Sequence, residues 1–281
     1  NPVSFGAFLG DWSRYIPRQT PKARIMLAVI ASQIGTLIPF LFGLCTATLV
    51  ASNAPEYIQA NNYVGGLLAI SPAWFFLPVC LIAVIGGMST GTTALYGTGL
   101  DMSSVFPRLL SRAGATLLIG VAAIAFIFIG RFAFNLVQSV STFAVLIITC
   151  TSPWMVIMIL GLITRRGYYH ADDLQVFTRG ERGGRYWFNH GWNWRGMGAW
   201  IPSAITGLCF VNLPGQFVGT LGELAGGIDI SLPITLGLAA VLYLALINLF
   251  PEPAAVYGPQ GPRWVYRKPA ASAPLSNAET A

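Results

Sequence analysis

The chain has 281 residues, of which 54% are hydrophobic and only 9% are charged. A soluble globular domain carries about 25% charged residues, so this chain lacks the polar side chains needed to coat a water-facing surface, and lipid is expected to be its main solvent. The formal net charge of +6 does not indicate nucleic-acid binding, because the basic residues fall between apolar blocks and do not form one basic face.

The order of apolar segments predicts the fold. Crossing a bilayer takes about 20 apolar residues in a helix, since lipid offers no partner to an unpaired backbone group. Between residues 18 and 250, six segments are candidate spans: 25–51, 73–102, 113–130, 134–163, 196–213 and 230–250. Residues 1–17 resemble the end of a truncated transmembrane helix with a cytoplasmic signature, and 251–281 a cytoplasmic, partly disordered tail. The expected fold is an all-α, polytopic transmembrane helix bundle.

The basic residues give an independent test of this topology. When the loops are assigned alternately to two sides, all but one of the 16 Lys and Arg residues fall on the same side, and the exception is Arg131. Cytoplasmic loops carry the excess of Lys and Arg. The pattern therefore predicts a multi-pass protein of the plasma (cytoplasmic) membrane with both ends of this chain in the cytoplasm.

The sequence offers little to an enzyme. Both histidines, His170 and His190, lie in one predicted cytoplasmic loop, which disfavours a Ser-His-Asp arrangement or a histidine metal site in the membrane. The four cysteines lie singly inside apolar blocks, without the spacing of a zinc or redox motif. We expect a protein that is not an enzyme and uses no cofactor.

A run of small and hydroxyl residues interrupts the second predicted span at Gly86–Thr93 (GGMSTGTT). On a helix, Ser89, Thr92, Thr93 and Tyr96 fall on one face. Hydroxyl oxygens, with carbonyls loosened at glycines, suit a small hard cation. Close helix packing through small residues, with hydroxyls bonded back to their own helix, explains the same pattern, and spacing alone favours this explanation.

Two further motifs carry candidate roles. In GDWSRYIP (Gly10–Pro17), Asp11 and Arg14 could form an ion pair at the cytoplasmic boundary, although an interfacial anchor with an aromatic belt fits equally. Pro153 lies inside the fourth span, where a proline removes a backbone hydrogen bond and tends to kink the helix. Such a kink could gate a pathway or simply bend the helix.

Several segments, taken in order, resemble the nucleobase–cation symporter family and in particular its purine–cytosine permease branch. They are GDWSRYIP (Gly10–Pro17), Ser89-Thr90, SPWMVIMILGLITRRGYY (Ser152–Tyr169), GGRYWFNHGWNWRGMGAW (Gly183–Trp200) and GGIDISLP (Gly226–Pro233). Each segment alone is a weak signal, whereas their order is specific.

The resemblance implies a LeuT-type fold of twelve spans, a five-plus-five inverted repeat with two extra helices. This chain would supply the end of the sixth span and the whole second half, so the N-terminal half of the same protein would be a missing partner. The implied function is symport of a nucleobase or related heterocycle, such as cytosine or a purine, by alternating access, with Na⁺ or H⁺ as the coupling ion.

The same resemblance assigns roles to individual residues. The cation, sodium if it is used, would bind at Gly86, Ser89 and Thr90. The implied substrate contacts are Phe5, whose ring would stack on the base, with Thr92, Thr93 and Tyr96, because an Asn of some family members is replaced by Leu95 here. The implied cytoplasmic signature contains Asp11, Arg14 and Tyr15, and these residues are candidates for gating together with Pro153, whose candidacy rests on its kink.

Two alternatives stay open at the level of sequence. A fold does not fix its ligand, so the chain could transport another small polar solute, such as an amino acid or a vitamin. It could also be a membrane scaffold or half-subunit that transports nothing.

Overall fold

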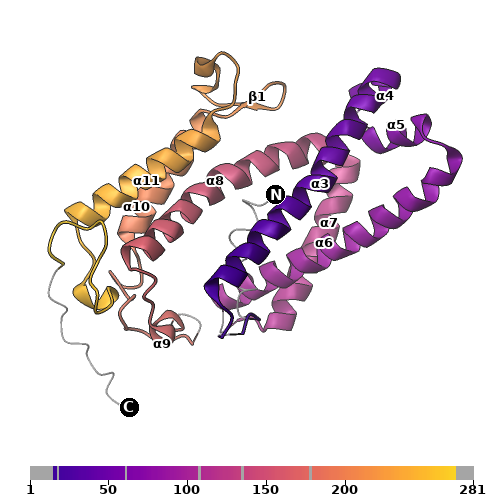
Figure 1. Ribbon diagram of the computed structural model, residues 1–281. Helices are drawn as coiled ribbons and strands as arrows, with labels where there is room; N and C mark the ends of the chain where they lie inside the picture. Colours follow the sequence, from indigo (N-terminus) through magenta and orange to yellow (C-terminus); the bar gives the residue numbers. More distant parts are fainter. Residues whose placement is uncertain are drawn as a thin grey trace. The chain divides into compact units, whose positions relative to one another are not determined.

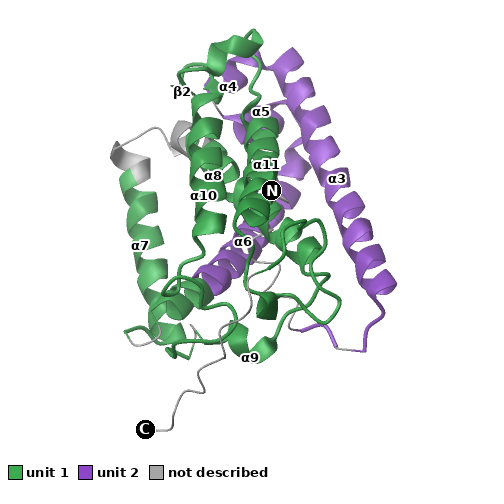
Figure 2. Ribbon diagram, turned by 90° about the vertical axis from the view of Figure 1, so that its left-hand side faces the viewer, with its two compact units in different colours: residues 1, 3–7, 99–281 green, residues 2, 8–98 purple. Residues whose placement is uncertain are grey.

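The computed structural model describes residues 15–17, 19–60, 62–106, 109–133, 136–176 and 179–269, without the side chains of residues 130–141. The chain divides into two compact units, which Figure 2 colours separately. One unit comprises residues 8–98 with residue 2, and the other comprises residues 99–281 with residues 1 and 3–7.

Helices make up almost all of the secondary structure, and Figure 1 labels most of them in chain order. They are α3 (Lys22–Asn53), α4 (Pro55–Gln59), α5 (Tyr63–Ile70), η1 (Ala73–Phe75), α6 (Phe76–Val105), α7 (Arg112–Ala133), α8 (Leu136–Thr164), α9 (Ala171–Leu174), α10 (Trp194–Cys209), η2 (Gly222–Ala225), α11 (Ser231–Leu249) and η3 (Ala254–Val256). Two short strands, β1 (Asn212–Leu213) and β2 (Phe217–Val218), pair antiparallel.

Within the described residues, five helices are long and apolar enough to cross a membrane. They cover Lys22–Asn53, Ala73–Val105, Arg112–Ile129, Thr142–Thr164 and Ser231–Leu249. Each overlaps one of the segments predicted from sequence. The chain is therefore a polytopic helical membrane protein, as its composition predicts.

In the unit of residues 8–98, the connection between the first two long helices folds back on the end of α3. Pro55 begins α4, and the Asn62 side chain caps α5 by accepting a hydrogen bond from the Gly65 N–H at 3.1 Å. Gly66 of α5 lies so close to Val50 and Tyr57 that a Cβ at this position would meet both. The connection between the two long helices thus contains two short helices.

The unit of residues 99–281 has its core where α8, α10 and α11 pack together. Ile157, Ala199, Tyr243 and Ile247 form a buried apolar cluster at one level of this contact. At another level the side chains are small and polar, and Gly207 of α10 allows close approach of its neighbours. Small residues at such contacts are typical of helix packing in membranes.

The hydroxyl groups in this contact are buried but satisfied. Thr149, Ser152, Ser203 and Thr235 each donate to the carbonyl oxygen four residues earlier in their own helix. This local bonding removes the cost of burying a hydroxyl without a partner.

The predicted span 196–213 is wrong at its C-terminal end. Helix α10 contains 16 residues and ends at Cys209, and Asn212–Leu213 belong to the hairpin. The Asn212 side chain donates to the Gly222 carbonyl at 3.0 Å, which holds the chain in a turn. A helix of this length rises about 24 Å, and α10 is not among the five helices that meet the length and hydropathy of a span.

Basic residues gather at one end of this unit. The end of α8, the start of α10 and the end of α11 lie together there, because Arg165 bonds Glu252 and Arg195 bonds the carbonyl oxygens of Phe250 and Pro251. No Lys or Arg occurs in the sequence between Arg195 and Arg263. The hairpin that joins α10 to α11 therefore carries no basic side chain.

Candidate functional site

The middle of α6, where sequence reasoning places the cation site, is uncovered among the described residues. Residues 81–92 are all exposed. A Cβ added at Gly86, Gly87 or Gly91 would meet no atom within 4 Å. Within the described part of the chain, these small residues therefore do not mediate close helix packing.

Two of the predicted substrate-binding hydroxyls bond back to α6. Thr92 Oγ1 donates to the Met88 carbonyl oxygen and Thr93 Oγ1 to that of Ser89, each at 2.8 Å. This is the local bonding expected from the packing explanation. A hydroxyl oxygen that donates its proton keeps its acceptor lone pairs, so these bonds leave both oxygens able to accept from a ligand.

The predicted cation ligands Gly86, Ser89 and Thr90 share this exposed stretch. In the residues that the structure covers, no group of three or more His, Cys, Asp and Glu side chains could hold a metal ion. A sodium site of hydroxyl and carbonyl oxygens is of a different kind, and it stays a prediction.

The structure brings two predicted residues together. The hydroxyls of Tyr15 and Tyr96 lie 2.9 Å apart, although 81 positions separate them. Tyr15 belongs to the GDWSRYIP motif, and Tyr96 lies on the hydroxyl face of α6. Phe5, Asp11 and Arg14 lie outside the described residues, so their predicted roles stay predictions.

Pro153 is fully buried in α8, where that helix packs in its unit. The indole Nε1 of Trp200 donates to the Cys150 carbonyl oxygen at 2.7 Å. A helix-interior proline disturbs the hydrogen bonds of the preceding turn, and Trp200 supplies a donor there from α10. The gating role of Pro153 stays a prediction.

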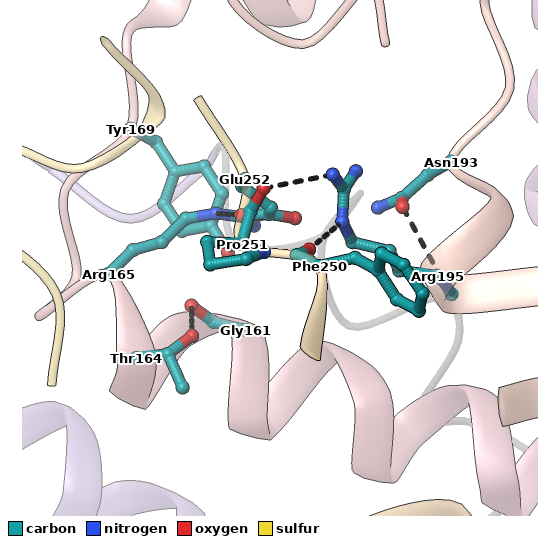
Figure 3. A network of polar contacts seen from close by, with 10 residues as sticks. Gly161, Thr164, Arg165, Tyr169, Asn193, Arg195, Phe250, Pro251 and Glu252 are labelled. Atoms are coloured by element: carbon teal, nitrogen blue, oxygen red, sulfur yellow. Dashed lines mark hydrogen bonds and ion pairs between the residues drawn. The ribbon is translucent and has the colours of Figure 1, made fainter. Parts of the chain in front are cut away.

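A buried ion pair that sequence reasoning missed joins the ends of α8 and α11 (Figure 3). Arg165 Nη2 lies 2.8 Å from Glu252 Oε1, and Arg165 Nε lies 3.2 Å from Glu252 Oε2, which makes the pair bidentate. The two side chains are 9% and 1% exposed. Arg165 Nη1 also donates to the Tyr169 hydroxyl at 3.1 Å.

Arg195 forms a second connection at the same end. Its Nε and Nη2 donate to the carbonyl oxygens of Phe250 and Pro251, the latter at 2.9 Å (Figure 3). Asn193 caps α10 by accepting from the Gly196 N–H at 3.4 Å. The residues after α11 are thereby held against the start of α10.

Residues 1–234 match the sequence family of permeases for cytosine/purines, uracil, thiamine and allantoin. The chain belongs to this permease family. The family predicted from sequence is thus confirmed, and by its description it is a family of permeases for small molecules rather than of enzymes.

A curated relative of the permease is the Bacillus subtilis (strain 168) protein named "Putative purine-cytosine permease YxlA". The two are 22% identical over 252 residues, which is 88% of this permease and 52% of the relative. The permease therefore spans about half the length of the curated relative that it matches. No solved structure matches it significantly.

The ionisable groups around the ion pair have shifted pKa values. Burial acts to lower the pKa of Arg165, but the Glu252 carboxylate and the neighbouring tyrosines together raise it overall, so the guanidinium stays charged. Burial raises the pKa of Tyr257 to about 12, and Glu252 adds to this rise. A raised tyrosine pKa means that folding favours the neutral phenol.

We expect the permease to lose stability between about pH 10 and about pH 12, because Tyr257 ionises near pH 10 when unfolded and near pH 12 when folded. Its contribution is fully present below the unfolded pKa and is lost as the pH rises through this window. Tyr257→Phe should therefore show a shallower loss, measured as the unfolding midpoint in detergent micelles at several alkaline pH values. Tyr266→Phe is the control, because Tyr266 is 89% exposed; equal slopes in both variants would refute the prediction.

Proposed function

We propose that the permease carries out cation-coupled symport of a nucleobase or related heterocycle, such as cytosine or a purine, by alternating access. The observation that carries this proposal is the family match over residues 1–234, since every solute in the family's description is a nitrogen heterocycle. The relative's name, which refers to purines and cytosine, agrees with it. The coupling ion would be Na⁺ or H⁺.

Most of the proposed ligand groups lie in the middle of α6. The Gly86 carbonyl and the Ser89 and Thr90 hydroxyls would bind the cation, because hard cations take oxygen ligands. Thr92, Thr93 and Tyr96 would accept or donate hydrogen bonds at the edge of the base, and Phe5 would stack on its face. The exposure of residues 81–92 supports this assignment, since no described side chain occupies the space beside Gly86 and Gly91.

A facing surface is needed to enclose these ligands. We propose that helices of a first half, as the resemblance to the family implies, cover the middle of α6 and complete a LeuT-type bundle. The cation and the base would be coupled because each stabilises the same enclosed conformer. The basic end of the unit of residues 99–281 would lie on the cytoplasmic side of the plasma membrane.

The cation site is tested by the double substitution Ser89→Ala with Thr90→Ala in the complete transporter that contains these residues. Sodium-dependent uptake of radiolabelled cytosine is expected to fall at least tenfold, because the loss of two oxygen ligands should weaken cation binding by more than about 1.4 kcal/mol. The control is Thr98→Ala, whose hydroxyl bonds the Ala94 carbonyl oxygen farther along the same helix.

Two results would reject this site. One is sodium-dependent uptake at the wild-type level in a double variant that is equally abundant in the membrane. The other is wild-type uptake that does not depend on the sodium concentration and falls only when the proton gradient is dissipated. This result would instead indicate proton coupling.

The second candidate is transport of a vitamin, because the family's description includes thiamine. Competition of cytosine uptake by unlabelled purines, uracil, thiamine and amino acids distinguishes the two. Inhibition by thiamine alone would favour the vitamin.

A further inference from the structure

A shallow hollow of about 450 Å³ opens where α11 ends and α10 begins. Its lining combines cationic side chains with aromatic and aliphatic ones: Trp194, Arg195, Leu249, Phe250, Arg267 and Lys268. No acidic side chain is part of this lining. The hollow belongs wholly to the unit of residues 99–281.

The three cations of this hollow have no carboxylate partner in the described part of the chain. The cationic partners of the ion pairs among the described residues are Arg165, Arg179, Arg185 and His170 instead. Arg267 Nη1 donates to the Leu249 carbonyl oxygen at 2.7 Å, and Arg195 is bonded to carbonyl oxygens in the same way. Neutral carbonyl groups fix both guanidinium groups in place but leave their charges uncompensated.

Capping of α11 explains only part of this arrangement. Cationic side chains often bond the last carbonyl groups of a helix, and Arg195 and Arg267 do so here. A guanidinium has five N–H donors, so both groups keep donors beyond those used for capping. Lys268 lines the hollow without capping the helix, and it adds a charge that capping does not require.

The hollow lies at the end of a candidate membrane span. Leu249 is the last residue of the span Ser231–Leu249. Leu249 and Phe250 are 57% and 51% exposed, so apolar surface continues up to the cations. Trp194, whose ring packs edge-on against Phe250 at a centroid distance of 5.1 Å, is of the residue type enriched at headgroup level.

We propose that this hollow binds an anionic phospholipid, with the headgroup phosphate held by Arg195, Arg267 and Lys268 and the first acyl carbons lying on Leu249 and Phe250. Guanidinium groups bind phosphate oxygens through paired N–H donors. Basic pockets at the ends of transmembrane helices recognise anionic headgroups in this way. The inference does not depend on which solute the permease transports.

The test measures lipid binding to the purified permease in neutral detergent micelles by native mass spectrometry. Phosphatidylglycerol is expected to bind more tightly than phosphatidylcholine. Arg267→Gln with Lys268→Gln should weaken phosphatidylglycerol binding by about tenfold to thirtyfold, since each cation near an anionic surface contributes on the order of 1 kcal/mol. Lys268→Gln alone should weaken it by about fivefold and disturbs no capping bond.

The matched control is Arg166→Gln with Arg182→Gln, which removes the same charge from exposed residues that do not line the hollow. Wild-type affinity in this control supports the site. Equal weakening in the control, equal affinity for phosphatidylcholine, or full competition by inorganic phosphate at the same phosphate concentration would each overturn the proposal. The last result would identify a site for soluble anions instead of lipid.

Discussion

Glu252→Gln is expected to lower the free energy of unfolding by about 3–5 kcal/mol, the cost of breaking a buried ion pair by removing one partner. The Arg165 guanidinium cannot lose its proton, so the variant would keep a cation at a side chain that is only 9% exposed. The loss should also loosen the chain after α11, because Glu252 is the carboxylate that joins it to α8. Equilibrium unfolding in detergent micelles measures the change.

A surface pair of the same chemistry provides the control. Asp172 lies 3.7 Å from Arg179, and these side chains are 76% and 47% exposed. Asp172→Asn should therefore change stability by less than about 1 kcal/mol. Replacing both members of the buried pair, by Arg165→Met with Glu252→Leu, should recover most of the lost stability, because no uncompensated charge remains. The idea fails if Glu252→Gln matches Asp172→Asn, or if the double variant is as unstable as the single one.

The long helices could be predicted from sequence because hydropathy is a local property. The segment expected over 230–250 is the helix Ser231–Leu249, and the one expected over 134–163 is Leu136–Thr164. The error at 196–213 arises from contacts between residues that are distant in sequence. Bonds from Asn212 to Gly222 and Asp229, which lie 10 and 17 positions away, turn the chain there, and hydropathy contains no information about them.

In the candidate site, too, local patterns could be predicted from sequence, whereas contacts between distant residues were missed. A hydroxyl face on α6 follows from the spacing of Ser89, Thr93 and Tyr96. What faces those residues is not encoded in their spacing, and the contact between Tyr96 and Tyr15 could not be foreseen. Arg165 and Glu252 are 87 positions apart. Sequence offered one signal for them, since an acidic residue directly after an apolar span needs either water or a cationic partner.

Gly207→Ala is expected to destabilise the contact of α8, α10 and α11 by about 1–3 kcal/mol, the usual cost of overpacking a core. A Cβ at this position would overlap Thr235 Oγ1 and lie 2.7 Å from Thr149 Cγ2. These are side chains of two other helices, and both are fully buried. Because both side chains are enclosed in the contact, the overlap requires these side chains or their helices to shift. The intrinsic preference of helices for Ala over Gly, about 0.5–1 kcal/mol, opposes this effect. It is smaller than the free-energy cost of the overlap.

Gly237 supplies the matched control, because it lies on α11 in the same unit and a Cβ there would meet no atom within 4 Å. Gly237→Ala should leave the unfolding midpoint unchanged or raise it slightly. Thr235→Ala, added to Gly207→Ala, removes the overlapping hydroxyl and should restore part of the lost stability, with the remainder due to Thr149. If Gly207→Ala and Gly237→Ala gave the same midpoint, α10 could not lie as close to α8 and α11 as the packing of Gly207 requires.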